Sequence, residues 1–190
     1  RLAFDEIFST FLVNSEIRKK IKKIKKKQKI LDKTKQSKII SKLDFILTND
    51  QKKTLEEINN DLSSTNKMFR LLQGDVGSGK TIVSLIAAYN SINSGFQVAV
   101  MAPTEILARQ HYNFAKKLFP KELNIELISG KSEYKTKKII LRKLADNEID
   151  IIFGTHAIFQ KKVNFKNLGL IIIDEQHKFG VNQRKKLSDK

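Results

Sequence analysis

The sequence contains no cysteine, and this absence removes two classes of site at once. Neither a disulfide framework nor a thiolate metal site can form, and the three histidines, His111, His156 and His177, lie too far apart for local zinc-ligand spacing. Long apolar runs are also missing. No stretch approaches the roughly 20 residues that a membrane-spanning helix requires, and no basic-then-apolar leader opens the chain. We therefore expect a cytoplasmic protein with no structural metal and no membrane partner.

Acidic residues are scarce as well, with 20 acids against 37 basic residues and a formal net charge of +17. Lysine supplies 31 of the basic residues, alongside abundant Ile and Asn, which is the usage expected of A/T-rich codons. The excess is concentrated in residues 18–42, which hold 13 Lys or Arg and a single acid, Asp32. Three interpretations of this basic cluster stay open: contact with nucleic-acid phosphates, a merely solvated helix face, and contact with a membrane surface.

The length of 190 residues, with 40% hydrophobic and 30% charged residues, suits one globular domain with or without an appendage. The chain begins at Arg1 rather than Met and ends at Lys190, shortly after an apolar stretch. We therefore expect a piece of a longer protein.

The first 31 residues predict helix, because their apolar positions recur mostly at spacings of three and four. This pattern indicates one long amphipathic helix or two in succession, and it breaks between Leu43 and Ile46. A new helix is expected after that break, with Thr48 or Asn49 as its N-cap. We divide the chain into a basic helical segment, 1–43, and a domain, 44–190. The apolar positions are Phe4, Ile7, Phe8, Phe11, Leu12, Ile17, Ile21, Ile24 and Leu31.

The rest of the chain alternates between apolar strands and helices. Strands are predicted at residues 69–73, 97–102, 124–129, 150–154 and 169–174, and helices are predicted to begin near Gly79, Thr104, Ser132 and Ile158. Gly95 follows the first of these helices at a C-cap position. Continuously apolar strands separated by helices predict an α/β fold, a mainly parallel sheet flanked by helices, with ligands at the carboxyl ends of the strands.

One segment carries the signature of a phosphate-binding loop. Residues 74–81 fit G-x-x-x-x-G-K-[ST], follow a predicted strand and open a predicted helix. Glycines let successive backbone N–H groups face phosphates, and the helix N-terminus adds positive charge. Lys80 would reach the outer phosphates of a nucleoside triphosphate, and the Thr81 hydroxyl would ligate Mg²⁺. The loop consists of Gly74, Asp75, Val76, Gly77, Ser78, Gly79, Lys80 and Thr81.

A pair of acids ends the last predicted strand. Asp174 and Glu175 follow the apolar residues 170–173. An acid at the tip of a buried strand can hold Mg²⁺, and a second acid beside it can polarise an attacking water. The pair therefore predicts ATP hydrolysis rather than phosphate transfer to a substrate, although two acids after a strand can also simply cap a helix.

Several segments in order carry a family resemblance: "FRLLQGDVGSGKT", "MAPTEILARQH", "GTHAIFQ" and "IIIDEQHKFGVNQR". Together they resemble the first motor domain of superfamily 2 helicases, and most of all the RecG family of branched-DNA helicases. The resemblance covers nearly the whole chain. It is weaker at "RLAFDEIF", which resembles the helical lead into the motor, and at "FILTNDQ", which resembles the adenine-reading Q motif. It implies a RecA-like P-loop domain that uses ATP and Mg²⁺ and acts in DNA repair and recombination.

The resemblance also implies roles for individual residues. Gln51, with Thr48 nearby, would recognise adenine, and residues 74–81 would bind the phosphates. Thr81 and Asp174 would hold the magnesium, while Lys80, Asp174 and Glu175 would carry catalysis. Gln176 and His177 would couple hydrolysis to domain movement. Contacts with the sugar-phosphate backbone of DNA would come from Pro103, Thr104, Glu105, Gly154, Thr155 and His156, and such contacts suit a motor that steps along any sequence. Structural alternatives stay open: Pro103 and Thr104 can simply end a strand and cap a helix, "GTHA" can be a strand-end turn, and His156 and His177 can be structural histidines.

Family members also carry parts that these 190 residues lack, namely a second motor domain with an arginine finger and a wedge domain that recognises forks. The chain alone is therefore expected to hydrolyse ATP very slowly. The resemblance further implies a monomer in the bacterial cytoplasm or nucleoid that acts on single-stranded or branched DNA. Two other functions stay open: the motor of a transcription-repair coupling translocase, and a non-enzymatic, nucleotide-dependent module that binds nucleic acid through the basic helix. The residues alone do not select DNA over RNA.

Overall fold

The computed structural model describes residues 25–130, 134–160 and 163–175, and these form two compact units. The first unit lies within residues 1–31 and 47–80, and the second within residues 32–46 and 81–190. The chain thus passes from the first unit into the second twice. Within the described ranges, no helix combines the length and the hydropathy of a membrane span.

The first unit is built on helix α3, Asn49–Ser63. Thr48 is its N-cap, as the sequence predicts, and it forms a complete capping box: its hydroxyl accepts from the Gln51 N–H, and the Gln51 side chain accepts from the Thr48 N–H. The helix buries one apolar stripe, formed by Leu55, Ile58 and Leu62. The cap therefore fixes the helix start, and the stripe fixes the face that packs.

Residues 25–31 depart from the helix that the sequence predicts for them. They are not helical; Lys25 instead forms an antiparallel bridge with Asn66, and the Lys26 N–H donates to the carbonyl of Thr65. The Lys26 ammonium donates to the carbonyls of Leu62 and Ser64, both at 2.6 Å. The last carbonyls of a helix lack intrahelical partners and attract cations, which explains why this segment runs along the end of α3. The helix predicted for residues 1–24 lies outside the described residues.

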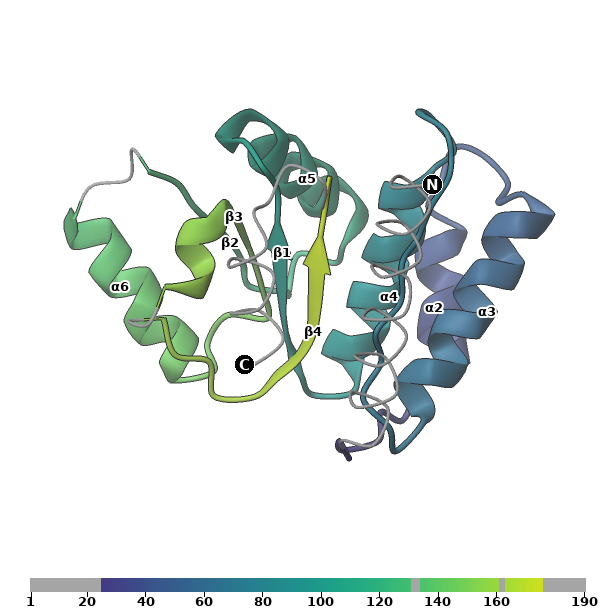
Figure 1. Cartoon of the computed structure of the whole chain (residues 1–190), viewed down its shortest axis with the longest axis horizontal. Helices are drawn as coiled ribbons and strands as arrows, with labels where there is room; N and C mark the ends of the chain where they lie inside the picture. Colours follow the sequence, from purple (N-terminus) through teal and green to yellow (C-terminus); the bar gives the residue numbers. More distant parts are fainter. Residues whose placement is uncertain (1–24, 131–133, 161–162, 176–190) are drawn as a thin grey trace, which may run out of the picture. The chain divides into compact units, whose positions relative to one another are not determined.

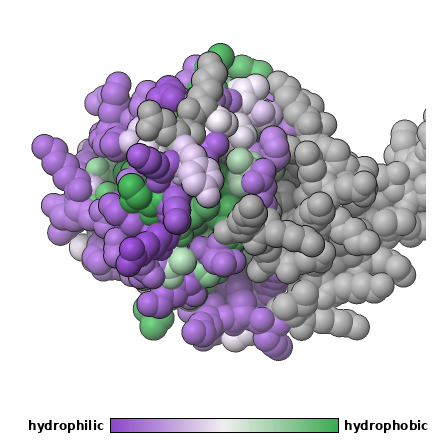
Figure 2. All heavy atoms as spheres, turned by 90° about the vertical axis from the view of Figure 1, so that its left-hand side faces the viewer, coloured by the Kyte–Doolittle hydropathy of each residue, from purple (hydrophilic) through white to green (hydrophobic). Residues whose placement is uncertain are grey.

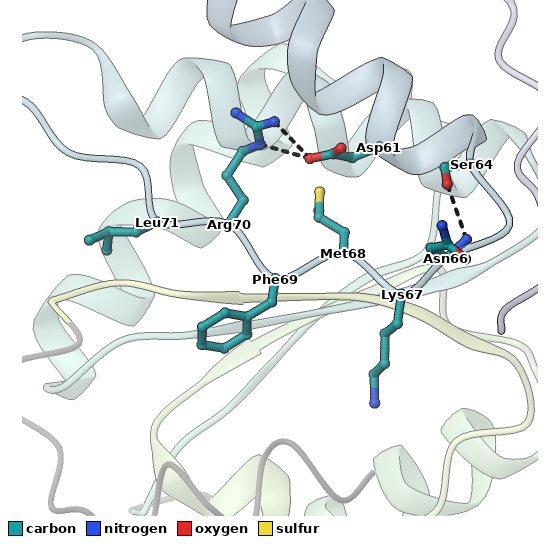
Figure 3. A pocket seen from close by; sticks show the side chains of 8 residues that line it. All are labelled: Asp61, Ser64, Asn66, Lys67, Met68, Phe69, Arg70 and Leu71. Atoms are coloured by element: carbon teal, nitrogen blue, oxygen red, sulfur yellow. Dashed lines mark hydrogen bonds and ion pairs between the residues drawn. The ribbon is translucent and has the colours of Figure 1, made fainter. Parts of the chain in front are cut away.

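The strand predicted at residues 69–73 is also wrong. Side chains alternate along this extended segment, since Met68 and Arg70 point toward α3 while Lys67 and Phe69 point away (Figure 3). No sheet ladder includes these residues in the described part of the chain, and the side chains of Phe69 and Leu71 are 52% and 60% exposed. An apolar, extended pattern predicts the conformation of a strand, but a hydrogen-bonded neighbour is a separate requirement.

The second unit contains a four-stranded parallel sheet in the order β2-β3-β1-β4 (Figure 1). Its strands are β1, Gln97–Met101; β2, Ile125–Ile128; β3, Ile151–Gly154; and β4, Leu168–Ile173. The other four predicted strands and the α/β fold class are therefore confirmed. Every residue of β1 and β3 is buried, as continuously apolar sequences require in a parallel sheet covered on both faces.

Helices α5, Glu105–Leu118, and α6, Tyr134–Ala145, cover opposite faces of this sheet. Ile140 and Leu144 of α6 belong to one core cluster with Ile152, whereas Tyr112 of α5 meets the ring of Phe153 edge-on at 6.2 Å between centroids. Ile152 and Phe153 are consecutive on β3, so their side chains point to opposite faces. The face that bears α6 is mainly hydrophilic (Figure 2), and that helix exposes Lys135, Lys138, Arg142 and Lys143.

Two more helices belong to the second unit: α2, Lys33–Ile40, and α4, Lys80–Asn93, whose first residue is assigned to the first unit. Asp32 caps α2 by accepting from the N–H groups of Thr34 and Lys35. Helix α4 is apolar nearly all round and is buried along most of its length, as such a pattern requires. Gly95 follows it with a φ of +82°, which confirms the predicted glycine cap.

Two details complete the second unit. The helix expected near Ile158 is only a four-residue 3₁₀ turn, His156–Phe159, because Gln160 returns to an extended conformation. Gln97 is buried, and both ends of its side-chain amide form hydrogen bonds. The nitrogen donates to the carbonyls of Leu144 and Ile149, and the oxygen accepts from the N–H of Asn167. This side chain therefore ties the end of α6 and the approach to β4 to the central strand.

Candidate active site

The loop of residues 74–79 has the backbone that the sequence predicts for it. Gly77 and Gly79 adopt φ values of +82° and +81°, in the left-handed region that side-chain-bearing residues rarely enter. Residues 74–78 are exposed, and Val76 projects entirely into solvent. The loop therefore presents accessible backbone just before helix α4 begins at Lys80.

The ammonium of Lys80 lies against the loop that precedes it. It donates to the carbonyls of Gly74 and Asp75, both at 2.7 Å. A Cβ at Gly74 would come within 2.8 Å of the Ser78 hydroxyl oxygen, so the loop closes tightly around its first glycine. The loop's own carbonyls thus hold the lysine side chain, and phosphate binding by Lys80 stays a prediction.

Gln51 joins helix α3 to this loop. Its side-chain amide donates to the carbonyl of Ser78 at 2.9 Å, while its oxygen accepts from the Thr48 N–H at 2.9 Å. The resemblance predicts that Gln51 and Thr48 read adenine, and nothing in the structure tests that prediction. The contacts do give Gln51 a second task, since they connect the capped start of α3 to the middle of the loop.

A pocket in the first unit lies between the end of α3 and the segment that follows it (Figure 3). Of its eight lining residues, Asp61 is the one acid, and its carboxylate already pairs with Arg70 at 2.8 Å. Arg70 also pairs with Glu57 at 2.6 Å, and these bonds raise the pKa of the guanidinium although burial opposes the rise. The pocket offers no unengaged acid for catalysis. It is lined by Asp61, Ser64, Asn66, Lys67, Met68, Phe69, Arg70 and Leu71.

In the second unit, the predicted functional segments meet at one edge of the sheet. Met101 of β1 is in register with Gly154 of β3 on one side and with Ile173 of β4 on the other. All three strands run parallel, so the residues after them emerge at the same edge, where such sheets bind ligands. The structure therefore brings together residues 103–105, 154–156 and 174–175, which are far apart in the sequence.

Residues 103–105 connect β1 to α5. Thr104 is the N-cap of α5, and its hydroxyl accepts from the Leu107 N–H at 3.3 Å. Glu105 occupies the first turn, where an acid complements the helix dipole, and it pairs loosely with Arg109 at 3.5 Å. The cap is a structural reason for threonine at position 104, and the helix dipole is a structural reason for an acid at position 105. The predicted DNA contacts of Pro103, Thr104 and Glu105 stay predictions.

Residues 154–156 end β3 and open the 3₁₀ turn. Gly154 has a structural reason to be glycine, because a Cβ there would lie 2.5 Å from the carbonyl oxygen of Ile128. Thr155 is the N-cap of the turn but makes no side-chain cap hydrogen bond, and His156 is exposed. Close packing therefore explains the glycine at position 154, and the predicted DNA contacts of Gly154, Thr155 and His156 stay predictions.

Hydrogen bonds to described residues hold Asp174 at the end of β4. Its N–H donates to the carbonyl of Met101 at 2.8 Å, one carboxylate oxygen accepts from the Glu175 N–H at 3.0 Å, and the other lies 2.8 Å from Nε2 of His111. Glu175 has a φ of +51°, in the left-handed region that side-chain-bearing residues rarely adopt. The two acids are therefore placed by the strand end and by a helix from elsewhere in the sequence. Gln176 and His177 lie outside the described residues.

The sequence did not predict a role for His111. The spacing of the histidines excludes a local zinc site but carries no information on the partner of His111, which is 63 positions away in the chain. The histidine lies seven residues after the N-cap Thr104 on α5 and ends the segment "MAPTEILARQH", which marks the residue but does not identify its partner. Only the parallel sheet brings its helix and the end of β4 together.

Burial also perturbs the basic segment of the first unit. Lys29 is buried, and burial lowers the pKa of its ammonium to about 8, with the nearby charge of Lys26 acting in the same direction. The pKa of Lys26 is lowered by burial too, although Asp61 opposes that effect. Lys26 and Lys29 therefore belong to the packing around α3 rather than to a solvated basic face.

The residues that would hold Mg²⁺ fit that ion chemically. Thr81 offers a hydroxyl and Asp174 a carboxylate, both oxygen donors of the kind that hard cations prefer. Magnesium is usually bound by one or two carboxylates together with substrate phosphates and water, rather than by a cage of protein ligands alone. A hydroxyl and a carboxylate are therefore a sufficient set of protein donors.

Comparison with known proteins agrees with these features. Residues 48–190 match the family model described as DEAD/DEAH box helicase. The chain is 46% identical over its whole length to the ATP-dependent DNA helicase RecG of Aquifex aeolicus, and 53% identical over 80% of its length to that of Bacillus subtilis. It spans 24% and 22% of those two relatives.

The chain also matches solved structures of helicases. The chain matches a structure described as RecG bound to a three-way DNA junction, with a TM-score of 0.84 and 44% identity over 95% of this chain and 25% of that one. The UvsW helicase of bacteriophage T4 matches with a TM-score of 0.59 at 19% identity, over 85% of this chain and 57% of that one, which supports the fold alone. Because the family model matches residues 48–190, most of the sequence, the chain belongs to the DEAD/DEAH box helicase family.

Proposed function

We propose that this chain is the first motor domain of an ATP-driven DNA helicase that acts on branched DNA in repair and recombination. The observation that carries the proposal is the convergence of three segments at one sheet edge, with Asp174 and Glu175 ending β4 beside the residues that follow β1 and β3. The similarity to RecG proteins supports branched DNA as the substrate, because one of them is described as bound to a three-way junction.

The residues divide the work of ATP hydrolysis between them. The backbone N–H groups of the loop around Gly77 and Gly79 would bind the phosphates, and Lys80 would exchange its two carbonyl partners for phosphate oxygens. Thr81 and Asp174 would hold Mg²⁺, which when bound neutralises charge that develops on the phosphates. Glu175 would orient and deprotonate the attacking water.

DNA would lie along the carboxyl edge of the sheet. Residues 103–105 and 154–156 emerge there from adjacent strands, so they can follow one sugar-phosphate backbone. Backbone contacts carry no base information, which suits an enzyme that steps along any sequence. Because α5 starts at this edge, a DNA contact at Thr104 would act directly on that helix.

The whole protein would add the remaining parts of the machine. We infer a second motor domain whose arginine completes the ATP site and a wedge domain that engages the junction, in a monomer of the bacterial cytoplasm. An arginine supplied in this way can be worth about 10³ to 10⁵ in rate, so the 190 residues alone are expected to turn over ATP very slowly.

The test is ATP turnover by the full-length protein with and without a synthetic three-way junction. Wild type should be stimulated strongly by the junction, and Lys80→Ala should abolish turnover because the phosphates lose their cation. Lys52→Ala, an exposed lysine on α3, serves as the matched control and should behave as wild type. Equal stimulation by duplex RNA, or none by any nucleic acid, would contradict the proposal.

A further inference from the structure

The contact between His111 and Asp174 links a helix to an acid that the proposed function assigns to magnesium. Nε2 of His111 lies 2.8 Å from a carboxylate oxygen of Asp174, with side-chain exposures of 13% and 33%. An ionised carboxylate can only accept, so the proton in this hydrogen bond resides on Nε2 of the imidazole. The histidine therefore donates to one oxygen of Asp174 and limits the rotation of its carboxylate.

The other oxygen of Asp174 is engaged as well. It accepts from the Glu175 N–H at 3.0 Å, and the Asp174 N–H is anchored to the carbonyl of Met101. The backbone half of this arrangement is fixed by the sheet, because Met101 pairs with Ile173 in β1 and β4. His111 is the side-chain contact in this set that comes from a helix, and so it can move with that helix.

Helix α5 connects this contact to the proposed DNA edge. Its N-cap is Thr104, and His111 follows seven residues later, a distance of about 10 Å along a helix axis. Ala108 and Ala115 are buried on the same helix, and Tyr112 packs edge-on against Phe153 of β3. A continuous helix transmits a shift at its first turn to a side chain two turns along, provided that the helix moves as a rigid body.

We propose that His111 is a positioning residue that orients the Asp174 carboxylate and couples its orientation to DNA bound at the start of α5. This inference rests on the proposed function, because it takes residues 103–105 as a DNA contact and Asp174 as a magnesium ligand. It adds a physical link between the DNA contact at residues 103–105 and the magnesium ligand Asp174. DNA at Thr104 stabilises one position of α5, that position fixes His111, and His111 fixes the orientation of the Asp174 carboxylate that would hold the metal.

The coupling is reciprocal, which gives it a distinctive signature. If DNA strengthens binding of the metal–nucleotide complex through α5, the metal–nucleotide complex strengthens DNA binding by the same factor. A histidine that merely filled space would leave this factor unchanged when replaced by a residue of similar size. The factor therefore separates a positioning role from a packing role.

The experiment uses full-length protein with three substitutions. His111→Gln keeps an N–H donor near the position of Nε2, His111→Leu removes the donor with little change in volume, and Gln110→Leu controls for a leucine at an exposed neighbouring site on α5. Binding of Mn²⁺ with a non-hydrolysable ATP analogue is followed by electron paramagnetic resonance, with and without a three-way junction. DNA-stimulated turnover is then measured against Mg²⁺ concentration.

For wild type and Gln110→Leu, we expect the junction to tighten Mn²⁺ binding about tenfold. For His111→Leu the tightening should be lost and the Mg²⁺ requirement should rise about tenfold, whereas His111→Gln should recover most of both. Wild-type behaviour in His111→Leu, or equal losses in the Leu and Gln variants, would overturn the inference. Wild type that binds no Mn²⁺–nucleotide complex, or that shows no stimulation by DNA, would instead overturn the proposed function on which the inference rests.

Discussion

The side-chain amide of Gln51 donates to the backbone carbonyl of Ser78 across 2.9 Å, and so it joins the capped start of α3 to the phosphate loop. The same amide closes the capping box with Thr48. One residue thus stabilises a helix start and restrains a loop whose two left-handed glycines give it little intrinsic rigidity.

Gln51→Glu tests this bracing role. The substitution keeps the side-chain length but replaces the N–H donor with an oxygen that faces the Ser78 carbonyl. Loss of one hydrogen bond is worth about 1 kcal/mol, so binding of ATP and of GTP should each weaken roughly fivefold to tenfold. Isothermal titration of both nucleotides measures the effect, with Lys52→Gln as the control on the same turn of α3. A loss confined to ATP would show instead that Gln51 reads the adenine base.

Gly154→Ala tests the packing role of the glycine that ends β3. A Cβ at this position would lie 2.5 Å from the Ile128 carbonyl oxygen and 2.9 Å from the side chain of Ile158, so strands β2 and β3 would have to separate. Overpacking of this kind typically costs about 1 to 3 kcal/mol.

The matched control for that substitution is Gly130→Ala, since a Cβ at Gly130 meets nothing within 4 Å. Urea denaturation should show a lower midpoint for Gly154→Ala and a nearly unchanged one for Gly130→Ala. Equal midpoints for the two variants would mean that the close approach of Gly154 to Ile128 has no energetic consequence.

Lys29 makes stability depend on pH. Burial lowers the pKa of its ammonium in the folded chain to about 8, below the unfolded value of 10.5. Between these two pH values the unfolded chain binds more protons, so the contribution of Lys29 to the free energy of unfolding rises with pH and is least favourable below about pH 8. Lys29→Met should therefore raise stability at pH 7 by at most about 3 kcal/mol.

The gain from Lys29→Met should shrink as pH rises from 8 to 10.5. Urea midpoints measured across that range, relative to wild type, give the result directly. Lys27→Met replaces an exposed lysine two residues away, and its difference in urea midpoint from wild type should not change over this pH range. Parallel pH profiles for wild type and Lys29→Met would contradict the assignment.

The sequence predicted the parts of the fold that depend on local chemistry. Thr48 as an N-cap, Gly95 as a C-cap, the start of α4 just after Gly79 and the start of α5 just after Thr104 all follow from residue types at neighbouring positions. Four strands were predicted because their apolar runs are bounded by turn residues. Capping and turn signals act over a few residues, so a single sequence reveals them.

The features that the sequence did not predict depend on distant partners. Residues 69–73 look like a strand but pair with no neighbour in the described part of the chain, and residues 25–31 follow the end of α3 instead of forming a helix. His111 meets Asp174 only because the sheet order brings α5 and the end of β4 together. The composition of a segment reports its conformational preference, whereas these contacts are decided by topology.

The central claim is that ATP hydrolysis at this domain drives work on branched DNA. The most direct measurement is separation of a fluorescently labelled three-way junction by the full-length protein, comparing wild type with Glu175→Gln in the presence of ATP. The account predicts ATP-dependent strand separation by wild type and none by Glu175→Gln, which should still bind both nucleotide and junction. Separation that proceeds equally with Glu175→Gln would contradict it, because the acid at the end of β4 would then not be the group that activates water.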